Sequence, residues 1–182
     1  MRIFIGIRID EKTRQKLGSM TRELAKGFRA WRPTDQANYH ITIKFIGETD
    51  EHTLEIIRRC IKTTAVGIEK FKTKTMGIGS FARNKKQTVF YKVENAAGLE
   101  KLYKRVCCEL NANGIHSDEQ KFIPHITVAR EVDAKDGFSL PVQKDINLAI
   151  DSISVMESTR LNGKLIYIPK LTVELEDKVN DK

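Results

Sequence analysis

The sequence predicts a two-lobed α+β fold with approximate internal two-fold symmetry, in which antiparallel sheets line a central cleft and helices lie outside. Two observations lead to this prediction. Segments with the period-two alternation of strands are interspersed with segments of helical spacing. Each half of the chain also runs through a strand, a helix and a further strand that contains the triplet His-Ile-Thr. The length of 182 residues fits one domain, expected at residues 1–175, followed by a polar tail at 176–182 that is expected to be frayed.

Five elements are expected in the first half. Isoleucines at every second position of residues 2–9 predict a strand with one apolar face. Asp10 can cap the helix that follows, and Gly27 can end it. Thr49 or Asp50 can cap a second helix, in which Leu and Ile recur at helical spacing. The expected strands are residues 2–9, 28–31 and 40–47, and the expected helices are residues 11–26 and about 50–64.

The second half is expected to contain one helix and five strands. Asn95 can cap the helix, whose stripe of Leu and Val residues runs to about residue 113 and is followed by Gly114. A short, polar and basic connection at residues 82–86 joins the first two strands. The last two strands are expected to pair with each other. The expected strands are residues 71–81, 87–93, 122–129, 146–156 and 165–175.

Composition narrows the class of protein. The formal net charge of +8 favours a polyanionic partner, although a lysine-rich solvated surface gives the same count. The three cysteines, Cys60, Cys107 and Cys108, are odd in number and include no CxxC pair, which argues against a disulfide framework or zinc site and for the cytoplasm. The sequence has no run of about 18 apolar residues, so no membrane span is expected. Its first residues alternate in the manner of a strand and do not have the pattern of a signal peptide. A monomer is the default expectation.

The triplet His-Ile-Thr occurs twice, each time inside an apolar run. One copy contains His40 and Thr42, and the other contains His125 and Thr127. Because residues i and i+2 of a strand point to the same face, each copy projects an imidazole and a hydroxyl together, with its apolar neighbours turned toward a core. Two such pairs facing each other would surround one anion-sized space with two titratable bases and two hydroxyl donors. That arrangement suits phosphoryl chemistry.

Other roles for these histidines stay open at this point. Each can be a structural histidine whose ring is satisfied by the backbone. Each can also be a metal ligand, but a catalytic zinc site usually needs three protein ligands, and neither motif face holds a carboxylate or cysteine. No metal site is therefore expected. The remaining two histidines, His52 at a helix start and His116 in a polar loop, are expected to be exposed bystanders.

Three stretches together resemble a known family. They are Trp-Arg-Pro at residues 31–33, Asn-Tyr-His-Ile-Thr-Ile-Lys-Phe-Ile-Gly at 38–47, and Phe-Ile-Pro-His-Ile-Thr-Val-Ala-Arg at 122–130. They resemble the two-histidine phosphoesterase superfamily, and within it the bacterial and archaeal RNA 2′,3′-cyclic phosphodiesterases, historically called 2′-5′ RNA ligases. The resemblance covers nearly the whole chain in length, motif order and spacing. The connection at 82–86 departs from it, because it lacks the prolines often found there.

The resemblance implies a two-lobed fold with a V-shaped cleft and a hydrolysis that needs neither metal nor cofactor. The reaction opens a terminal 2′,3′-cyclic phosphate of RNA and leaves a 2′-phosphate. By the same resemblance, His40 matches the proton donor to the leaving oxygen, and His125 matches the base that takes a proton from water. Thr42 and Thr127 match the hydroxyls that hold the phosphate, and Arg130 matches a cation of the cleft.

Several further residues are candidates for contact with RNA. Lys44 is expected on the face of His40, with Phe45 turned inward, although a solvated lysine at the rim is an equal alternative. Tyr39, Phe81 and Trp31 are candidates to stack on a base, and packing in the core or at the rim is the competing role. The basic residues at 83–86 either steer RNA or only form a polar hairpin tip.

Two rival functions remain. A related phosphodiesterase for small cyclic nucleotides or 2′-5′ oligoadenylate would use the same motifs, and comparing rates on an RNA oligomer and a cyclic mononucleotide separates it. A non-catalytic module that binds RNA ends or nucleotides belongs to another class. Two complete His-Thr pairs argue against such a module, because binding alone does not need two proton-transfer groups.

Overall fold

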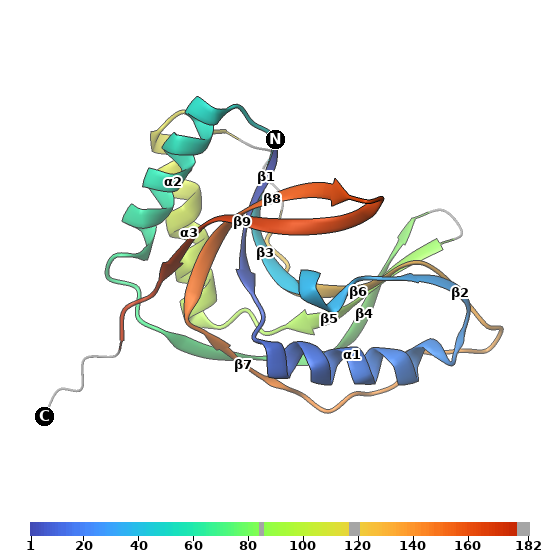
Figure 1. Cartoon of the computed structure of the whole chain (residues 1–182). Helices are drawn as coiled ribbons and strands as arrows, with labels where there is room; N and C mark the ends of the chain where they lie inside the picture. The colour runs from blue at the N-terminus through green and yellow to red at the C-terminus, as the bar shows by residue number, and fades with distance from the viewer. Residues whose placement is uncertain (84–85, 117–120, 178–182) are drawn as a thin grey trace, which may run out of the picture.

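Two antiparallel sheets form the frame of the protein (Figure 1), whose structure, a computed structural model, describes residues 1–83, 86–116 and 121–177. The strand order is β3-β1-β8-β9 in the four-stranded sheet and β2-β6-β5-β4-β7 in the five-stranded sheet. The strands are β1 (Arg2–Arg8), β2 (Phe28–Pro33), β3 (His40–Glu48), β4 (Phe71–Arg83), β5 (Lys86–Val93), β6 (His125–Ala134), β7 (Asn147–Ile150), β8 (Ser152–Leu161) and β9 (Lys164–Glu174). The predicted α+β class with antiparallel sheets is confirmed.

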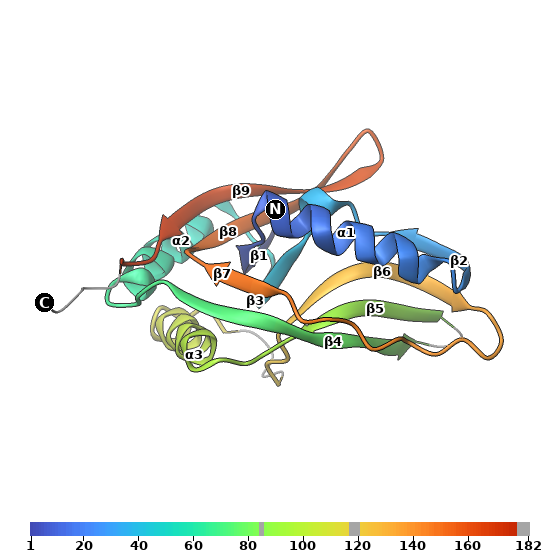
Figure 2. The same ribbon diagram turned by 90° about the horizontal axis from the view of Figure 1, so that it is seen from below.

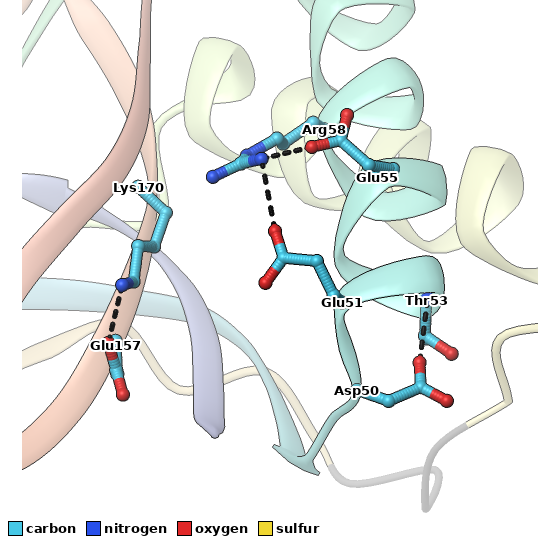
Figure 3. Close-up of polar contacts among 7 residues, drawn as sticks. All are labelled: Asp50, Glu51, Thr53, Glu55, Arg58, Glu157 and Lys170. Atoms are coloured by element: carbon cyan, nitrogen blue, oxygen red, sulfur yellow. Dashed lines mark hydrogen bonds and ion pairs between the residues drawn. The ribbon is translucent and has the colours of Figure 1, made fainter.

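The helices begin largely where the sequence places them. They are α1 (Glu11–Ala25), α2 (Glu51–Ala65), α3 (Ala97–Ala112) and the short 3₁₀ helix η1 (Gln36–Asn38). The Asp10 carboxylate accepts from the backbone N–H of Thr13 at 2.9 Å, and the Asp50 carboxylate accepts from that of Thr53 at 2.8 Å (Figure 3). Both acids therefore cap as predicted. The prediction for Asn95 is wrong, because α3 starts one residue later, after Ala96, without a side-chain cap.

The helices lie on the outside of the two sheets (Figures 1 and 2). α2 packs against β8 and β9 and also against α3, which reaches β3 and β4. α1 packs against β2 and β6 of the other sheet, although it follows β1 in the chain. The first helix therefore covers the sheet that carries the second motif. The buried apolar residues of both sheets form one continuous core. Within the described residues, no helix has the length and apolar character needed to cross a membrane.

The expected symmetry of the halves is visible in the strand pairing. In the first half, β1 pairs antiparallel with β3, the strand that begins at His40. In the second half, β5 pairs antiparallel with β6, which begins at His125. In the first half, the motif strand β3 thus pairs with the strand that precedes α1. In the second half, the motif strand β6 pairs with the strand that precedes α3.

The sequence predicted one strand at residues 146–156, and this prediction is wrong. It divides into β7, which pairs with β4 in the five-stranded sheet, and β8, which pairs with β1 and β9 in the other sheet. The break is at the exposed Asp151. The β-branched and leucine side chains alternate at Leu148 and Ile150 before it and resume out of phase at Ile153 and Val155 after it, and all four are buried. This change of phase marks the point where the chain leaves one sheet for the other.

The last residues of the described chain remain attached to the fold. Glu176 forms an isolated bridge with Glu69, and its carboxylate accepts from the backbone N–H of Gly67. Lys70 forms an ion pair with Asp177 at 2.7 Å. The rest of the expected tail, residues 178–182, lies outside the described residues.

Candidate active site

The two His-Thr motifs come together where the two sheets meet. β3, at an edge of the four-stranded sheet, contacts β6 of the five-stranded sheet. Along both strands the side chains alternate as predicted. The histidines and threonines are half-buried, whereas the apolar positions between them, Ile41, Ile43, Ile126 and Val128, are at most 3% exposed and lie in the core. The fold therefore brings both imidazoles and both hydroxyls to one region of the molecule.

The backbone holds the two imidazoles in the same way. Nδ1 of His40 lies 2.6 Å from the carbonyl oxygen of Asn38, and Nδ1 of His125 lies 2.7 Å from that of Ile123. A carbonyl can only accept, so each Nδ1 carries a hydrogen, and each Nε2 is left as the nitrogen that exchanges protons. Nε2 of His40 lies 3.0 Å from the hydroxyl oxygen of its motif partner Thr42.

Each imidazole also packs against two aromatic rings. The ring centroid of His40 lies 4.9 Å from those of Phe4 and Tyr167. That of His125 lies 5.0 Å from Phe90 and 5.5 Å from Phe81. Phe81 was predicted as a site residue, but the other three rings were not. The alternation of β1 contained a signal for Phe4, because it lies on the face opposite the isoleucines. Tyr167 comes from β9 and gave no such signal.

Basic residues lie beside both histidines in the strand ladders. Arg8 on β1 is directly opposite His40, and Lys92 on β5 is directly opposite His125. Both side chains are exposed. Directly opposite residues of an antiparallel pair share a face, so each imidazole has a cation next to it on its own sheet. Neither residue was among the site residues predicted from the sequence.

Burial changes the titration of His40. Burial is the largest cause, and together with the charges of Arg130 and His125 it lowers the pKa of His40 from 6.5 to about 4, against the opposite effect of the Asn38 carbonyl. His40 is therefore neutral at pH 7 in the free protein. Arg130 and His125 both lie on β6, the strand that contacts β3.

This lowered pKa predicts a loss of stability in mild acid. The unfolded chain binds a proton at His40 near pH 6.5, whereas the folded chain does so only near pH 4. The contribution of His40 to the free energy of unfolding should therefore be complete above about pH 6.5. It should fall by at most about 3 kcal/mol as the pH drops to about 4. Denaturant unfolding of the native protein and His40→Gln at pH 7 and pH 4.5 measures it. An equal loss in both proteins would contradict the lowered pKa.

Arg130 supplies a cation that no carboxylate of the described residues neutralises. It lies in β6 beyond the second motif and is half-buried. Its neighbour in the ladder, Arg32 of β2, instead forms an ion pair with Glu131 at 3.0 Å. A guanidinium close to His40 and without a carboxylate partner is suited to hold the oxygens of a phosphate.

The positions of Lys44 and Phe45 differ from the predicted ones. A bulge at Ile43 shifts the register, so Lys44 lies opposite Ile5, whereas Thr42 lies opposite Gly6. Ile5 and Gly6 point to opposite faces, and the bulge thus places Lys44 away from the face of His40 and Thr42. Phe45 is 47% exposed rather than inward, and Arg2 lies over its ring at 5.1 Å.

The three aromatic candidates have different surroundings. Tyr39 is 3% exposed and lies in the core, where burial raises the pKa of its hydroxyl, so it does not present a face to a base. Trp31 is half-buried and packs edge to face on Phe28 at 6.0 Å. Phe81 is 43% exposed, lies against His125, and stacks on Phe90 at 4.3 Å. Of the three, Phe81 has the position suited to stacking on a base.

The remaining expectations concern bystanders and metals. His52 and His116 are exposed, as predicted. Of the basic tip at residues 83–86, residues 84 and 85 lie outside the described part of the chain, and Lys86 is 4.0 Å from Glu131. Across residues 1–83, 86–116 and 121–177, no group of three or more His, Cys, Asp or Glu side chains is arranged to hold a metal ion.

Comparison with known proteins identifies a family that this chain matches. The family model described as the 2′-5′ RNA ligase superfamily matches residues 9–160. An RNA 2′,3′-cyclic phosphodiesterase of Thermotoga maritima is 32% identical over 174 residues, which cover 92% of this chain and 91% of the relative. A protein of the same name from Archaeoglobus fulgidus is 29% identical over 131 residues, which cover 71% and 72% of the two chains.

Solved structures share the fold. A protein of Thermus thermophilus superposes with a TM-score of 0.82 at 22% identity, over 98% of this chain and 100% of the other. The E. coli protein LigT complexed with 3′-AMP superposes with a TM-score of 0.80 at 20% identity, over 96% of this chain and 97% of the other. At these identities the likeness concerns the fold alone, and it agrees with the two-sheet arrangement described above.

Proposed function

Because the chain belongs to the 2′-5′ RNA ligase superfamily, we propose that it hydrolyses terminal 2′,3′-cyclic phosphates of RNA to 2′-phosphate ends, with His40 and His125 as its proton-transfer groups. The name shared by its relatives, RNA 2′,3′-cyclic phosphodiesterase, supports the reaction. The observation that carries the proposal for this chain is the pairing of the two motifs. Both imidazoles are held through Nδ1 by a backbone carbonyl and leave Nε2 for chemistry, on strands that contact each other.

The proposed mechanism assigns one proton transfer to each histidine. Water attacks phosphorus while the bond to the 3′ oxygen breaks on the opposite side. Nε2 of His125 takes the proton from water, and Nε2 of His40 gives a proton to the departing 3′ oxygen. The hydroxyls of Thr42 and Thr127 donate to the non-bridging oxygens, where negative charge increases in the transition state. Arg130 adds a permanent positive charge for the same oxygens. Neither transfer needs a metal ion. Weak 2′-5′ ligation is the same step with a 5′-hydroxyl in place of water: the 5′ oxygen bonds to phosphorus and gives its proton to His125, while the bond to the 3′ oxygen breaks and that oxygen takes the proton of His40.

The proposal also requires His40 to gain a proton when substrate binds. In the free protein its pKa is about 4, so it is neutral at pH 7. A bound phosphate brings negative charge next to His40 and offsets the charge of Arg130, and both effects favour the imidazolium. The phosphate on which His40 acts therefore favours the protonated form that His40 needs as an acid.

NMR titration of the imidazoles tests whether His40 gains a proton when the phosphate binds. With a saturating nucleoside 2′-phosphate, the pKa of His40 is expected to rise by at least about one unit above its value in the free protein, because the anion stabilises the imidazolium. The exposed His116 serves as the internal control, and its imidazole signals should be the same in both samples. An unchanged pKa of His40 in the saturated complex would contradict its assignment as the acid.

Phe81 is proposed to stack on a base of the RNA. Its ring is exposed and is already supported by Phe90 and His125. Phe81→Ala is expected to raise KM for an RNA oligomer about 5-fold to 100-fold, since stacking contributes about 1–3 kcal/mol per base, with a smaller change in kcat. Phe45→Ala, which removes a similarly exposed ring from the far end of β3, is the matched control. Equal KM values for both variants and the native protein would remove Phe81 from the site.

The RNA substrate is tested by comparison with a small one. We expect a higher kcat/KM for an RNA oligomer with a 2′,3′-cyclic phosphate end than for a 2′,3′-cyclic mononucleotide, because Arg8 and Lys92 can contact additional phosphates. The reverse order would favour small cyclic nucleotides as the substrate. The three cysteines are free, which fits the proposed location in the cytoplasm, and size-exclusion chromatography tests the proposed monomer.

A further inference from the structure

The carbonyl group that holds His40 belongs to a residue whose own side chain is bound elsewhere. The side-chain amide of Asn38 donates from Nδ2 to the backbone carbonyl of Leu165 at 2.8 Å, across 127 positions of sequence. Asn38 is only 7% exposed, so this hydrogen bond is largely shielded from water. At the same residue, the main-chain carbonyl accepts from Nδ1 of His40 at 2.6 Å. Asn38 thus connects β9 directly to the imidazole.

The surrounding backbone leaves Asn38 little freedom. It is the last residue of η1, and its backbone N–H donates to the carbonyl of Asp35 at 2.9 Å. The Asp35 carboxylate accepts from the N–H of Ala37 at 2.9 Å and caps this short helix. The side-chain bond to Leu165 ties this turn to β9, on the far side of the four-stranded sheet from β3.

A second contact from β9 reaches the same imidazole. Tyr167, two residues after Leu165, packs its ring edge to face against His40 at 4.9 Å and 84°. β9 belongs to the β8–β9 hairpin, whose tip extends beyond the rest of its sheet (Figure 2). His40 is therefore held from the hairpin in two ways, by the ring of Tyr167 and through the carbonyl of Asn38.

Among the described residues, His125 has no equivalent of the Asn38 side-chain hydrogen bond. Its Nδ1 is held by the carbonyl of Ile123, but the Ile123 side chain is apolar and 46% exposed, so it makes no hydrogen bond to another element. The two halves therefore repeat the histidine-carbonyl contact and differ in what stabilises that carbonyl.

We propose that Asn38 is a positioning residue, which uses the β8–β9 hairpin to fix the carbonyl that orients His40 for proton transfer. The effect on turnover rests on the proposed function, whereas the effect on the imidazole does not. Asn38→Ala removes the bond to Leu165, so the main-chain carbonyl is no longer fixed to β9. Asn38→Asp keeps the size of the side chain but replaces the donating amide with an acceptor.

Turnover and the state of the imidazole are measured together. For Asn38→Ala and Asn38→Asp we expect kcat to fall about 10-fold to 100-fold, with KM within about 3-fold, since a small misplacement of a reacting group has effects of this size. In ¹⁵N NMR spectra, the His40 imidazole should lose its preference for the Nδ1–H tautomer, and the His125 imidazole should keep it. Native kcat and a native His40 spectrum in Asn38→Asp would overturn the proposal.

A control separates this effect from general loosening of the hairpin. Glu157 of β8 and Lys170 of β9 form an ion pair at 2.7 Å (Figure 3). Glu157→Gln weakens the hairpin without touching Asn38, Tyr167 or His40, and it should leave kcat and the His40 spectrum unchanged. A loss in Glu157→Gln as large as in the Asn38 variants would overturn the specific role of Asn38.

The native protein provides a readout that does not depend on the variants folding. The Nδ1–H proton of His40 should exchange with solvent more slowly than that of His125, because among the described residues the Asn38 side chain is hydrogen-bonded to β9 and the Ile123 side chain makes no such bond. A faster exchange at His40 would overturn the proposal. If the native protein turns over no RNA end, the proposed function fails, and the exchange rates and tautomers still decide the role of Asn38.

Discussion

Alanine at His40 or at His125 is expected to lower kcat by about 10²–10⁴-fold for cyclic-phosphate RNA, because each imidazole carries one proton transfer. The double variant should be scarcely slower than the worse single variant, since the two transfers belong to one step. His52→Ala and His116→Ala are matched controls. Both histidines are exposed and lie outside the paired motifs, so these variants should retain native kcat.

The two single variants of the motif histidines also provide the result that would contradict this expectation. Single-turnover rates at pH 7 measure the chemical step without product release. If His40→Ala or His125→Ala kept more than about a tenth of the native rate, the altered residue would not be the general acid or base that the mechanism requires.

Loss of a motif hydroxyl is the second large expected effect. Thr42→Val and Thr127→Val keep a β-branched side chain suited to a strand and remove one donor each. Each is expected to lower kcat by about 10²–10³-fold, because a preorganised donor acts on charge that develops in the transition state. KM should change much less. The measurement is kcat and KM for cyclic-phosphate RNA at saturating concentrations.

The two threonine variants should differ in one respect. The Thr42 hydroxyl lies 3.0 Å from Nε2 of His40, so Thr42→Val should also shift the pH dependence of kcat, whereas Thr127→Val should not. Thr172→Val on β9 is the control, because Thr172 is exposed and its hydroxyl pairs with that of Ser154 at 2.9 Å. A native kcat in both motif variants would exclude the hydroxyls from holding the phosphate.

Alternation along strands predicted most of what the two motifs do. It placed His40 and Thr42 on one face and Ile41 and Ile43 on the other, and the structure confirms this division. A strand has a fixed period of two, so local sequence is enough to assign its faces until the period is interrupted. The bulge at Ile43 is such an interruption, and it explains why Lys44 and Phe45 were misplaced.

Contacts between segments that are distant in the sequence could not be predicted from local patterns. Tyr167 and Leu165 lie more than 120 positions after His40, and their contacts depend on the order of strands in the four-stranded sheet. The same holds for α1, which covers the sheet of the second motif. Sheet order follows from packing of the whole core rather than from any one segment. The change of phase at Asp151 is present in the sequence, although residues 146–156 were predicted as one strand.

Turnover of a defined RNA end in the absence of available metal tests the central claim most directly. A short RNA oligomer with a 2′,3′-cyclic phosphate is incubated with the native protein in excess EDTA, and the product phosphate is identified. The two-histidine mechanism predicts complete conversion to a 2′-phosphate end, at a rate unchanged by EDTA and lost in His40→Ala and His125→Ala. Activity that disappears with EDTA and returns with a divalent metal ion, or a 3′-phosphate product, would contradict it.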